Sequence, residues 1–252
     1  MEFLIFYESP LPLLTLWFIF TYILGYFIIF KNWNNKYRSE AASCLMSLAH
    51  GTPALVLSIL SILQSQKSIS QLDFTSPNTA LQNLVLEHSI AYFLMDLFHY
   101  MVLIPSDVLF IAHHVASLYV LTTCRYLFGH GAVAIWASLF WLRLQTSCQN
   151  TWSLSRYRKV DSEKAAGVFE FLSPYFYAYF SVVRGILGPL YVYKIGLVFN
   201  SGVADGLIPR WAWVSWIVVI AGGIGGSILW VLHLWIDLYR ERKTKKGLKK
   251  LS

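Results

Sequence analysis

Long apolar runs, separated by short polar connections, dominate this chain. Seven of these runs approach the roughly 20 residues that a helix needs to cross a bilayer. They lie at about 11–30, 41–63, 88–104, 107–127, 131–152, 165–193 and 211–238. The pattern predicts an all-α, polytopic membrane protein with about seven transmembrane helices.

Helix-breaking residues divide these runs. Only four residues join the third run to the fourth, where Pro105 ends one helix and Ser106 or Asp107 can cap the next. The sequence therefore predicts a tight helical hairpin. The sixth run contains Pro174 and a glycine–proline cluster at 185–189, so we expect it to be kinked or to form two shorter pieces.

Composition supports the membrane class. The 252 residues are 56% hydrophobic and only 13% charged, whereas a soluble domain carries about 25% charged residues. The length suits one helical bundle with no sizeable soluble domain. We expect three parts: a luminal N-terminus with a first helix (1–38), a main helical domain (39–239) and a basic cytosolic tail (240–252).

Basic residues predict how the chain is oriented. With seven crossings, fourteen of the twenty Lys and Arg residues fall on one side, seven of them in the tail after 239, and only four fall on the other. The positive-inside rule then predicts a cytosolic C-terminus and a luminal N-terminus. Because these residues lie on loops and a tail beside the membrane, anionic lipid is the expected partner and a nucleic acid is not.

The chain ends Lys249-Lys250-Leu251-Ser252. Lysines three and four residues from a cytosolic end resemble the di-lysine signal that retrieves proteins to the endoplasmic reticulum. This predicts residence in that membrane. A chance pair in a lysine-rich tail is the alternative.

Ionisable residues within two apolar runs predict an intramembrane site. Asp96 and His99 share a helix face in the third run, and His113 and His114 lie side by side in the fourth. Such groups are costly in a bilayer unless they are paired or face a cavity. Adjacent helical residues point about 100° apart, so we expect one histidine to face a pocket while the other bonds a neighbouring helix. The alternative is that these residues only hold helices together.

The fifth run is too polar to face lipid. Arg143, Gln145, Gln149 and Asn150 lie on it, and we expect them to line the same cavity. Arg143 could bind a phosphate or a carboxylate of a lipid head group. Alternatively, Arg143 pairs with an acidic side chain or extends to the membrane surface.

Other polar and small residues are weaker signals. His50 precedes Gly51 and Pro53, which predicts a kinked helix whose histidine can point into the cavity. Gly222 and Gly226 have the spacing of a motif that permits close helix packing. No metal-binding, nucleotide-binding or hydrolase motif is present, so the sequence predicts neither a metal nor a bound cofactor.

Two stretches resemble the TLC-domain family, which includes ceramide synthases and a group of small membrane proteins. The first is the stretch from Asp107 to His114, preceded by a hairpin with Asp96 and His99. The second is Gln145-x-Ser147-x-x-Asn150-x-Trp152. The resemblance covers roughly 40–240 and is strongest to plant members of the small-protein group.

The resemblance implies a barrel of six helices around a cavity for a long acyl chain, here with one leading helix. By the same resemblance, His113 and His114 would be a catalytic pair, and Asp107 would match the acidic residue upstream of that pair. Acyl-CoA would be a co-substrate, with a sphingoid base as acceptor.

The chain departs from ceramide synthases in one respect. They carry a second acidic motif on the next helix, whereas residues 136–145 contain no carboxylate and Gln145 stands where small relatives often have Glu. Three hypotheses follow. The protein binds a lipid or acyl chain and acts in membrane lipid homeostasis, it is an N-acyltransferase of the ceramide synthase type in sphingolipid metabolism, or it is a trafficking or chaperone factor for membrane proteins.

Overall fold

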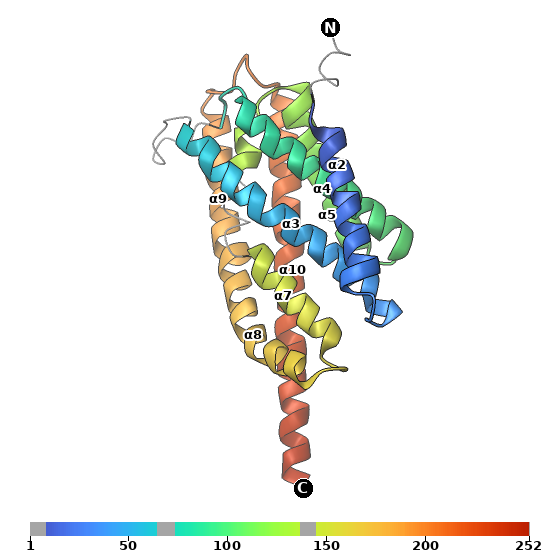
Figure 1. Cartoon of the computed structure of the whole chain (residues 1–252). Helices are drawn as coiled ribbons and strands as arrows, with labels where there is room; N and C mark the ends of the chain where they lie inside the picture. The colour runs from blue at the N-terminus through green and yellow to red at the C-terminus, as the bar shows by residue number, and fades with distance from the viewer. Residues whose placement is uncertain (1–8, 65–73, 137–144, 252) are drawn as a thin grey trace.

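The computed structural model describes residues 9–64, 74–136 and 145–251, and throughout these ranges the regular structure is helical (Figure 1). The longer elements are α2 (Leu11–Leu24), α3 (Asn35–Gln64), α4 (Ala80–Leu103), α5 (Val108–Thr122), α7 (Gln145–Arg158), α8 (Glu163–Val182), α9 (Gly188–Asn200) and α10 (Arg210–Leu251). Three π-helical turns continue α2, α5 and α8: η1 (Gly25–Ile29), η2 (Thr123–Leu127) and η3 (Val183–Leu187). The chain is therefore an all-α, polytopic membrane protein.

Five helices of the described ranges are long and apolar enough to cross a membrane. They are Leu11–Ile29, Tyr37–Gln64, Val108–Leu127, Glu163–Asn200 and Arg210–Arg240. The 24 residues of α4 would extend about 36 Å, but this helix contains many polar side chains. Seven crossings therefore stay a prediction, and part of the fifth predicted run, residues 137–144, lies outside the described residues.

The predicted hairpin joins α4 to α5. The carboxylate of Asp107 accepts a hydrogen bond from the backbone N–H of Phe110 at 3.3 Å, so Asp107 is the residue that caps α5. At its other end α4 begins with a reciprocal cap between Thr79 and Gln82. Local hydrogen bonds of side chains thus fix the start of α4 and the start of α5.

The sixth predicted run is one continuous helix, not two pieces. Residues 163–200 are helical throughout, with the π-helical turn η3 in the middle. Within it the N–H of Gly188 donates to the carbonyl of Val183, five residues back. Pro189 follows directly, and because a proline lacks an N–H and clashes with the carbonyl four residues earlier, a wider turn accommodates it.

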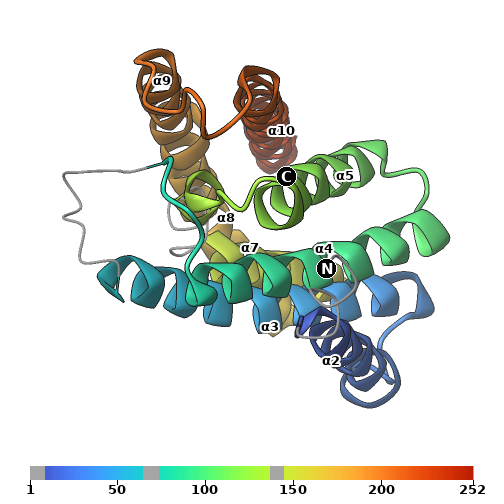
Figure 2. The same cartoon turned by 90° about the horizontal axis from the view of Figure 1, so that it is seen from above.

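Six helical segments form a ring in the order α3, α4, α5, α10, α8–α9 and α7, each in contact with the next. Seen from above, α3 and α4 lie side by side across from α5, α10 and α9, and α2 lies outside them (Figure 2). The α2 helix packs on α3 and α4 through a cluster that includes Phe18, Met46 and Ala91. The order matches a six-helix barrel with one leading helix.

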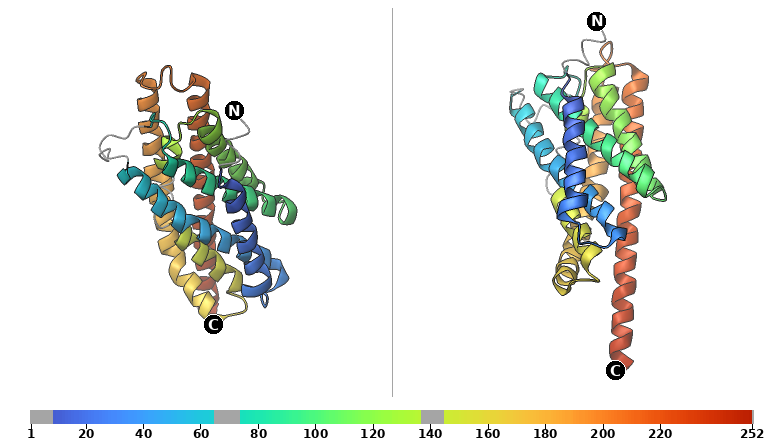
Figure 3. Two further views of the ribbon diagram at one scale, coloured as in Figure 1. Left: turned by 45° about the horizontal axis from the view of Figure 1, so that its top comes forward. Right: turned by 45° about the vertical axis from the view of Figure 1, so that its right-hand side comes forward.

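One end of the bundle collects basic residues. Arg158 at the end of α7 lies over the ring of Trp33, and Tyr157 stacks on Tyr37 at the start of α3. The start of α8 lies at this end, and α10 runs past it (Figure 3). The basic segments at 31–38, 156–164 and 240–250 therefore share one end, as the charge pattern predicts.

Candidate functional site

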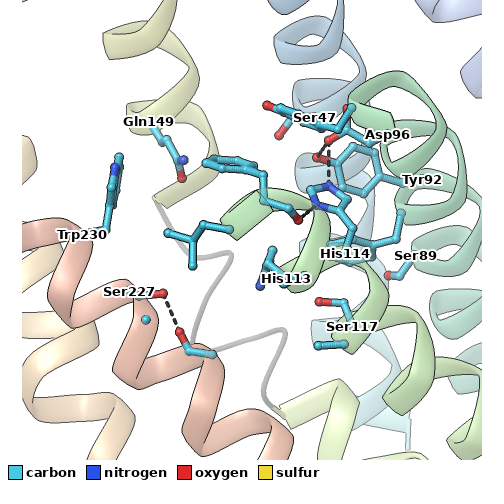
Figure 4. Close-up of a pocket in the computed structure, with 18 of the residues that line it drawn as sticks. Ser47, Ser89, Tyr92, Asp96, His113, His114, Ser117, Gln149, Ser227 and Trp230 are labelled. Carbon is cyan, nitrogen blue, oxygen red and sulfur yellow. Dashed lines mark hydrogen bonds and ion pairs between the residues drawn. The ribbon is translucent and has the colours of Figure 1, made fainter. Parts of the chain in front are cut away.

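A cavity of about 590 Å³ lies inside the ring (Figure 4). Its walls come from α3, α4, α5, α7, α8, η3 and α10. The volume falls within the roughly 300–1,000 Å³ of sites that bind small molecules. The ring of helices therefore leaves space for a ligand, and the residues that line this space decide which kind of ligand fits.

One wall of the cavity is a hydrogen-bonded network around Asp96, which is 2% exposed. The hydroxyl of Ser43 donates to Oδ1 at 2.6 Å, and the hydroxyl of Tyr92 donates to Oδ2 at 3.0 Å. His114 Nε2 lies 2.9 Å from the same Oδ2. This carboxyl group thus ties α3, α4 and α5 together at the edge of the cavity.

The second nitrogen of His114 fixes the charge of this pair. Nδ1 lies 2.7 Å from the carbonyl oxygen of Phe110, which can only accept, so Nδ1 carries a proton. One further proton then lies between Nε2 and the Asp96 carboxyl group. Whether that proton belongs to the imidazole or to the carboxyl group, the pair as a whole has no net charge, and both nitrogens of His114 are engaged.

The environment of His113 differs from that of His114. Its ring points into the cavity, while His114 turns toward Asp96 and Tyr92 (Figure 4). Its ring contacts are with Phe93 and His114, at centroid distances of 6.0 and 5.6 Å. The two adjacent histidines thus have different environments, and His113 is the one whose nitrogens face the ligand space.

A second histidine group lies beside this network. The ring of His50 stacks on Tyr92 with a centroid distance of 4.3 Å, and its Nε2 pairs with Ser89 at 3.1 Å. His50 lines the cavity, as the neighbouring Gly51 and Pro53 suggested, whereas the ring of His88 stacks on the His50 ring and does not line the cavity. These rings support Tyr92 in the position from which it donates to Asp96.

The polar face of α7 reaches the cavity as expected. Gln149 and Asn150 both line it, and the amide nitrogen of Asn150 donates to the hydroxyl of Ser47 on α3 at 2.9 Å. Gln145 is the first residue of α7. The side chain of Gln145, and the whole of Arg143, lie outside the described residues.

Two predicted site residues lie away from the cavity. His99 is 60° around α4 from Asp96, which turns it toward α2, where Nδ1 pairs with the hydroxyl of Tyr22 at 3.2 Å. Asp107 caps α5 and does not line the cavity. The expectation that His99 faces the cavity is therefore wrong, and the geometry gives Asp107 a structural role. Lys249 and Lys250 lie in the final turns of α10, and nothing is described of their side chains.

Sequence reasoning missed two partners of Asp96 and one cation. Tyr92 precedes Asp96 by four residues on one helix face, a spacing that could have indicated it. Ser43 comes from another helix and left no local signal. Arg184 lines the cavity from η3, although its position in an apolar run indicated only that it needed a polar environment.

A buried ion pair lies elsewhere in the bundle. Glu87 on α4 is 1% exposed and accepts from Nε and from a terminal nitrogen of Arg125 on η2, both at 2.6 Å. The hydroxyl of Ser9, just before α2, donates to the other Glu87 oxygen at 2.6 Å. Neither Glu87 nor Arg125 lines the cavity.

The wall of the cavity that α10 forms consists partly of glycines, which leave open space. An added Cβ at Gly222 or Gly223 would meet nothing within 4 Å, whereas one at Gly226 would lie 3.6 Å from Leu109 of α5. Only Gly226 of the predicted packing pair therefore approaches a neighbouring helix. Gly222 and Gly223 instead leave room in the cavity.

These features define a class: a multi-pass membrane protein with a partly polar cavity inside a ring of six helical segments. The TLC domain family model matches residues 40–236, so the chain belongs to the TLC domain family. A TLC domain-containing protein of Arabidopsis thaliana is 48% identical over 238 residues, covering 94% of this chain and 92% of the relative. No solved structure matches the chain at a significant level.

Proposed function

We propose that this protein binds a single lipid or acyl chain in its cavity and acts in the lipid homeostasis of the membrane in which it resides. The observation that carries this proposal is the cavity of about 590 Å³ between the helices of the ring. A water-filled void of this size in a helical bundle would serve no packing purpose, because protein interiors are otherwise close-packed.

The lining of the cavity suits an amphiphile. Asp96, His113 and Arg184 supply polar groups, while Val120, Phe180, Val219, Ile220 and Trp230 supply apolar surface. A ligand with one polar group and one chain can satisfy both parts, since apolar surface binds the chain and a few polar groups orient the head.

A cavity-filling substitution tests this proposal. Gly223→Leu would place a side chain in the open space of the cavity, and Gly225→Leu adds the same side chain two residues away, where Cβ also meets nothing within 4 Å but the residue does not line the cavity. Both replace a helical glycine and should leave stability unchanged or raise it by up to about 1 kcal/mol.

The readout is the amount of lipid that co-purifies with the protein in detergent, measured by mass spectrometry. We expect the wild type and Gly225→Leu to retain a defined lipid at similar occupancy, and Gly223→Leu to retain several-fold less, since the side chain occupies ligand space. Equal retention by both variants, or no lipid in the wild type, would contradict the proposal.

Acyl transfer is a second candidate, and the position of His113 favours it. An imidazole facing the cavity could take the proton of a neutral amine as that amine attacks the thioester carbonyl of acyl-CoA. The new N–C bond would form as the C–S bond breaks, and the thiol of coenzyme A would leave with a proton. His114 suits the base role less well, because both of its nitrogens are engaged.

This candidate is tested by adding acyl-CoA and a sphingoid base to the purified protein. Under acyl transfer, new N-acyl product forms with the wild type, disappears in His113→Ala, and survives in part in a folded His114 variant. Retention of lipid without product would favour binding alone. A protein-trafficking role would instead predict a stable protein partner and indifference to Gly223→Leu.

The endoplasmic reticulum is the membrane we propose, with the C-terminus in the cytosol. Basic segments gather at one end of the bundle, and Lys249 and Lys250 stand at the positions of a di-lysine signal. Replacing both lysines with serine should shift the protein to later secretory compartments. An epitope at the C-terminus should be reached by antibody after the plasma membrane alone is permeabilised.

A further inference from the structure

We propose that the cavity binds one lipid tail whose end lies between α5 and α10, and that Val219 sets the longest tail that fits. The inference rests on the proposed function and deepens it, because it names the direction of the ligand in the bundle and the residue that limits its length. Two observations carry it. The side chains along the cavity differ in polarity from one end to the other, and hydrogen bonds join α5 to α10 just beyond the apolar end.

The end of the cavity far from the basic segments has an apolar wall. α10 runs from this end toward the basic tail, and its first lining residues are Val219 and Ile220. The last lining residues of α5 are Val120 and Leu121. All four side chains, together with the lining residue Ala134, belong to the main buried cluster or pack against it. A wall of this kind offers a ligand apolar contacts, which suits the tail of a lipid.

Two hydrogen bonds join α5 to α10 next to this wall. The hydroxyl oxygens of Tyr119 and Ser215 are 2.7 Å apart, and the indole N–H of Trp216 donates to the hydroxyl of Thr123 at 2.8 Å. Ser215 and Trp216 precede Val219 by about one helical turn, and Trp216 is fully buried. A tail that reaches Val219 therefore meets a packed, hydrogen-bonded junction of two helices and ends there.

The other end of the cavity carries hydroxyl groups. Tyr100, Ser153 and Tyr157 line it, and Tyr157 stacks on Tyr37 at the end of the bundle where the basic segments gather. Hydroxyl groups can donate hydrogen bonds to a head group and accept them from it. The ligand therefore lies with its head group toward the basic segments and its tail toward Val219.

The cavity is short compared with a bilayer. Its lining on α5 extends from Leu109 to Leu121, which is about 18 Å at the rise of a helix, whereas the hydrocarbon core is about 30 Å thick. A longer tail must displace its own head group or compress packed side chains. Val219 lines the cavity, whereas its neighbour Val218 is 63% exposed and does not. The two valines thus make a matched pair for a test.

The test measures which tail lengths the protein retains. Purified wild type, Val219→Phe, Val219→Ala and the control Val218→Phe are each incubated in detergent with an equimolar mixture of saturated monoacylglycerols, from decanoyl to docosanoyl. The same experiment with free fatty acids of the same lengths controls for the head group. After gel filtration, mass spectrometry gives the amount of each lipid that stays bound, and circular dichroism shows whether each variant is folded.

We expect the wild type and Val218→Phe to retain lipids up to the same longest tail and little beyond it. Val219→Phe should retain about tenfold less of that longest tail, because its ring overfills the end of the cavity, and should keep the shorter tails. Val219→Ala should admit longer tails than the wild type does.

The inference is overturned if the wild type shows no upper limit of tail length, or if Val219→Phe and Val218→Phe give the same profile. Should Val219→Phe fail to fold, a profile of Val219→Ala identical to that of the wild type would overturn it equally. A wild type that retains none of the lipids would instead refute the proposed function, and the inference with it.

Discussion

Two buried pairs of ionisable side chains connect α4 to the next helical segment, and they differ in what surrounds them. Asp96 meets His114 of α5 at 2.9 Å, and Glu87 meets Arg125 of η2 at 2.6 Å. Both acidic side chains are almost fully buried. The first pair borders the cavity. The second pair does not line it, and the hydroxyl of Ser9 donates a further hydrogen bond to its carboxylate.

The comparison shows that an ionisable residue inside a membrane bundle does not by itself mark a functional site. Glu87 and Arg125 satisfy each other, and a paired charge can serve only to hold helices together. Asp96 and His114 also satisfy each other, but their neighbour His113 faces open space. We therefore expect the two pairs to respond differently to mutation in stability and in lipid retention.

The largest effect is expected from Glu87→Ala. It leaves the guanidinium of Arg125 in a largely buried position without its carboxylate, which should lower the free energy of unfolding by about 3–5 kcal/mol. Denaturation of the purified protein by SDS, followed by circular dichroism, measures this change. The fraction that stays folded should retain lipid as the wild type does, because the pair does not line the cavity.

A double variant controls for the lost charge. Glu87→Leu with Arg125→Leu removes both partners, and since a well-packed apolar pair often replaces a buried ionic pair at no cost, most of the stability should return. A double variant as unstable as Glu87→Ala would mean that the pair itself, and not the unpaired arginine, determines stability here.

The second effect concerns the adjacent histidines. His114→Ala removes a partner of the buried Asp96 and should lower the free energy of unfolding by about 2–3 kcal/mol. His113→Ala truncates a ring that faces the cavity, so its cost should stay within about 1 kcal/mol. The same SDS titration measures both, and equal losses would contradict the assignment of the two rings.

Lipid retention gives a second way to distinguish the cavity wall at His113 from the Glu87 pair. His113→Ala should change the amount or identity of the co-purifying lipid while leaving stability nearly intact, whereas a variant at the Glu87 pair should do the reverse. An unchanged lipid profile in His113→Ala would show that this ring, despite its position, does not contact the ligand.

Sequence alone predicted the parts of the fold that depend on local pattern. Apolar run length gave the helical membrane class, and Pro105 with Asp107 gave the α4–α5 hairpin. The 100° step of a helix predicted that adjacent histidines would take different environments, but not which one would face the cavity. That depends on how α5 is rotated against α4 and α10, a tertiary property.

The residues that the sequence misplaced or missed share one cause, because their positions depend on how the helices pack. His99 was grouped with Asp96 because the two lie three residues apart, yet 60° around α4 is enough to turn one toward α2 and the other toward the cavity. Glu87 lay one residue outside the predicted apolar run that begins at 88, so its burial left no signal. The hydroxyl of Ser43 comes from another helix, and only packing shows its bond to Asp96.

The smallest effect separates two serines of α3. Ser43→Ala removes the hydroxyl that donates to Asp96 at 2.6 Å and should lower the free energy of unfolding by about 1 kcal/mol, because a buried acceptor loses one of its donors. Ser58 is fully buried, and its hydroxyl finds no hydrogen-bond partner within the described ranges. Ser58→Ala should therefore be neutral or stabilising. SDS titrations of the two variants compare the same atom change on one helix, with the Asp96 network as the difference. If both variants lose equal stability, the hydrogen bonds around Asp96 contribute no more to folding than ordinary packing does. The distinction between the Asp96 pair and the Glu87 pair would then rest on lipid retention alone.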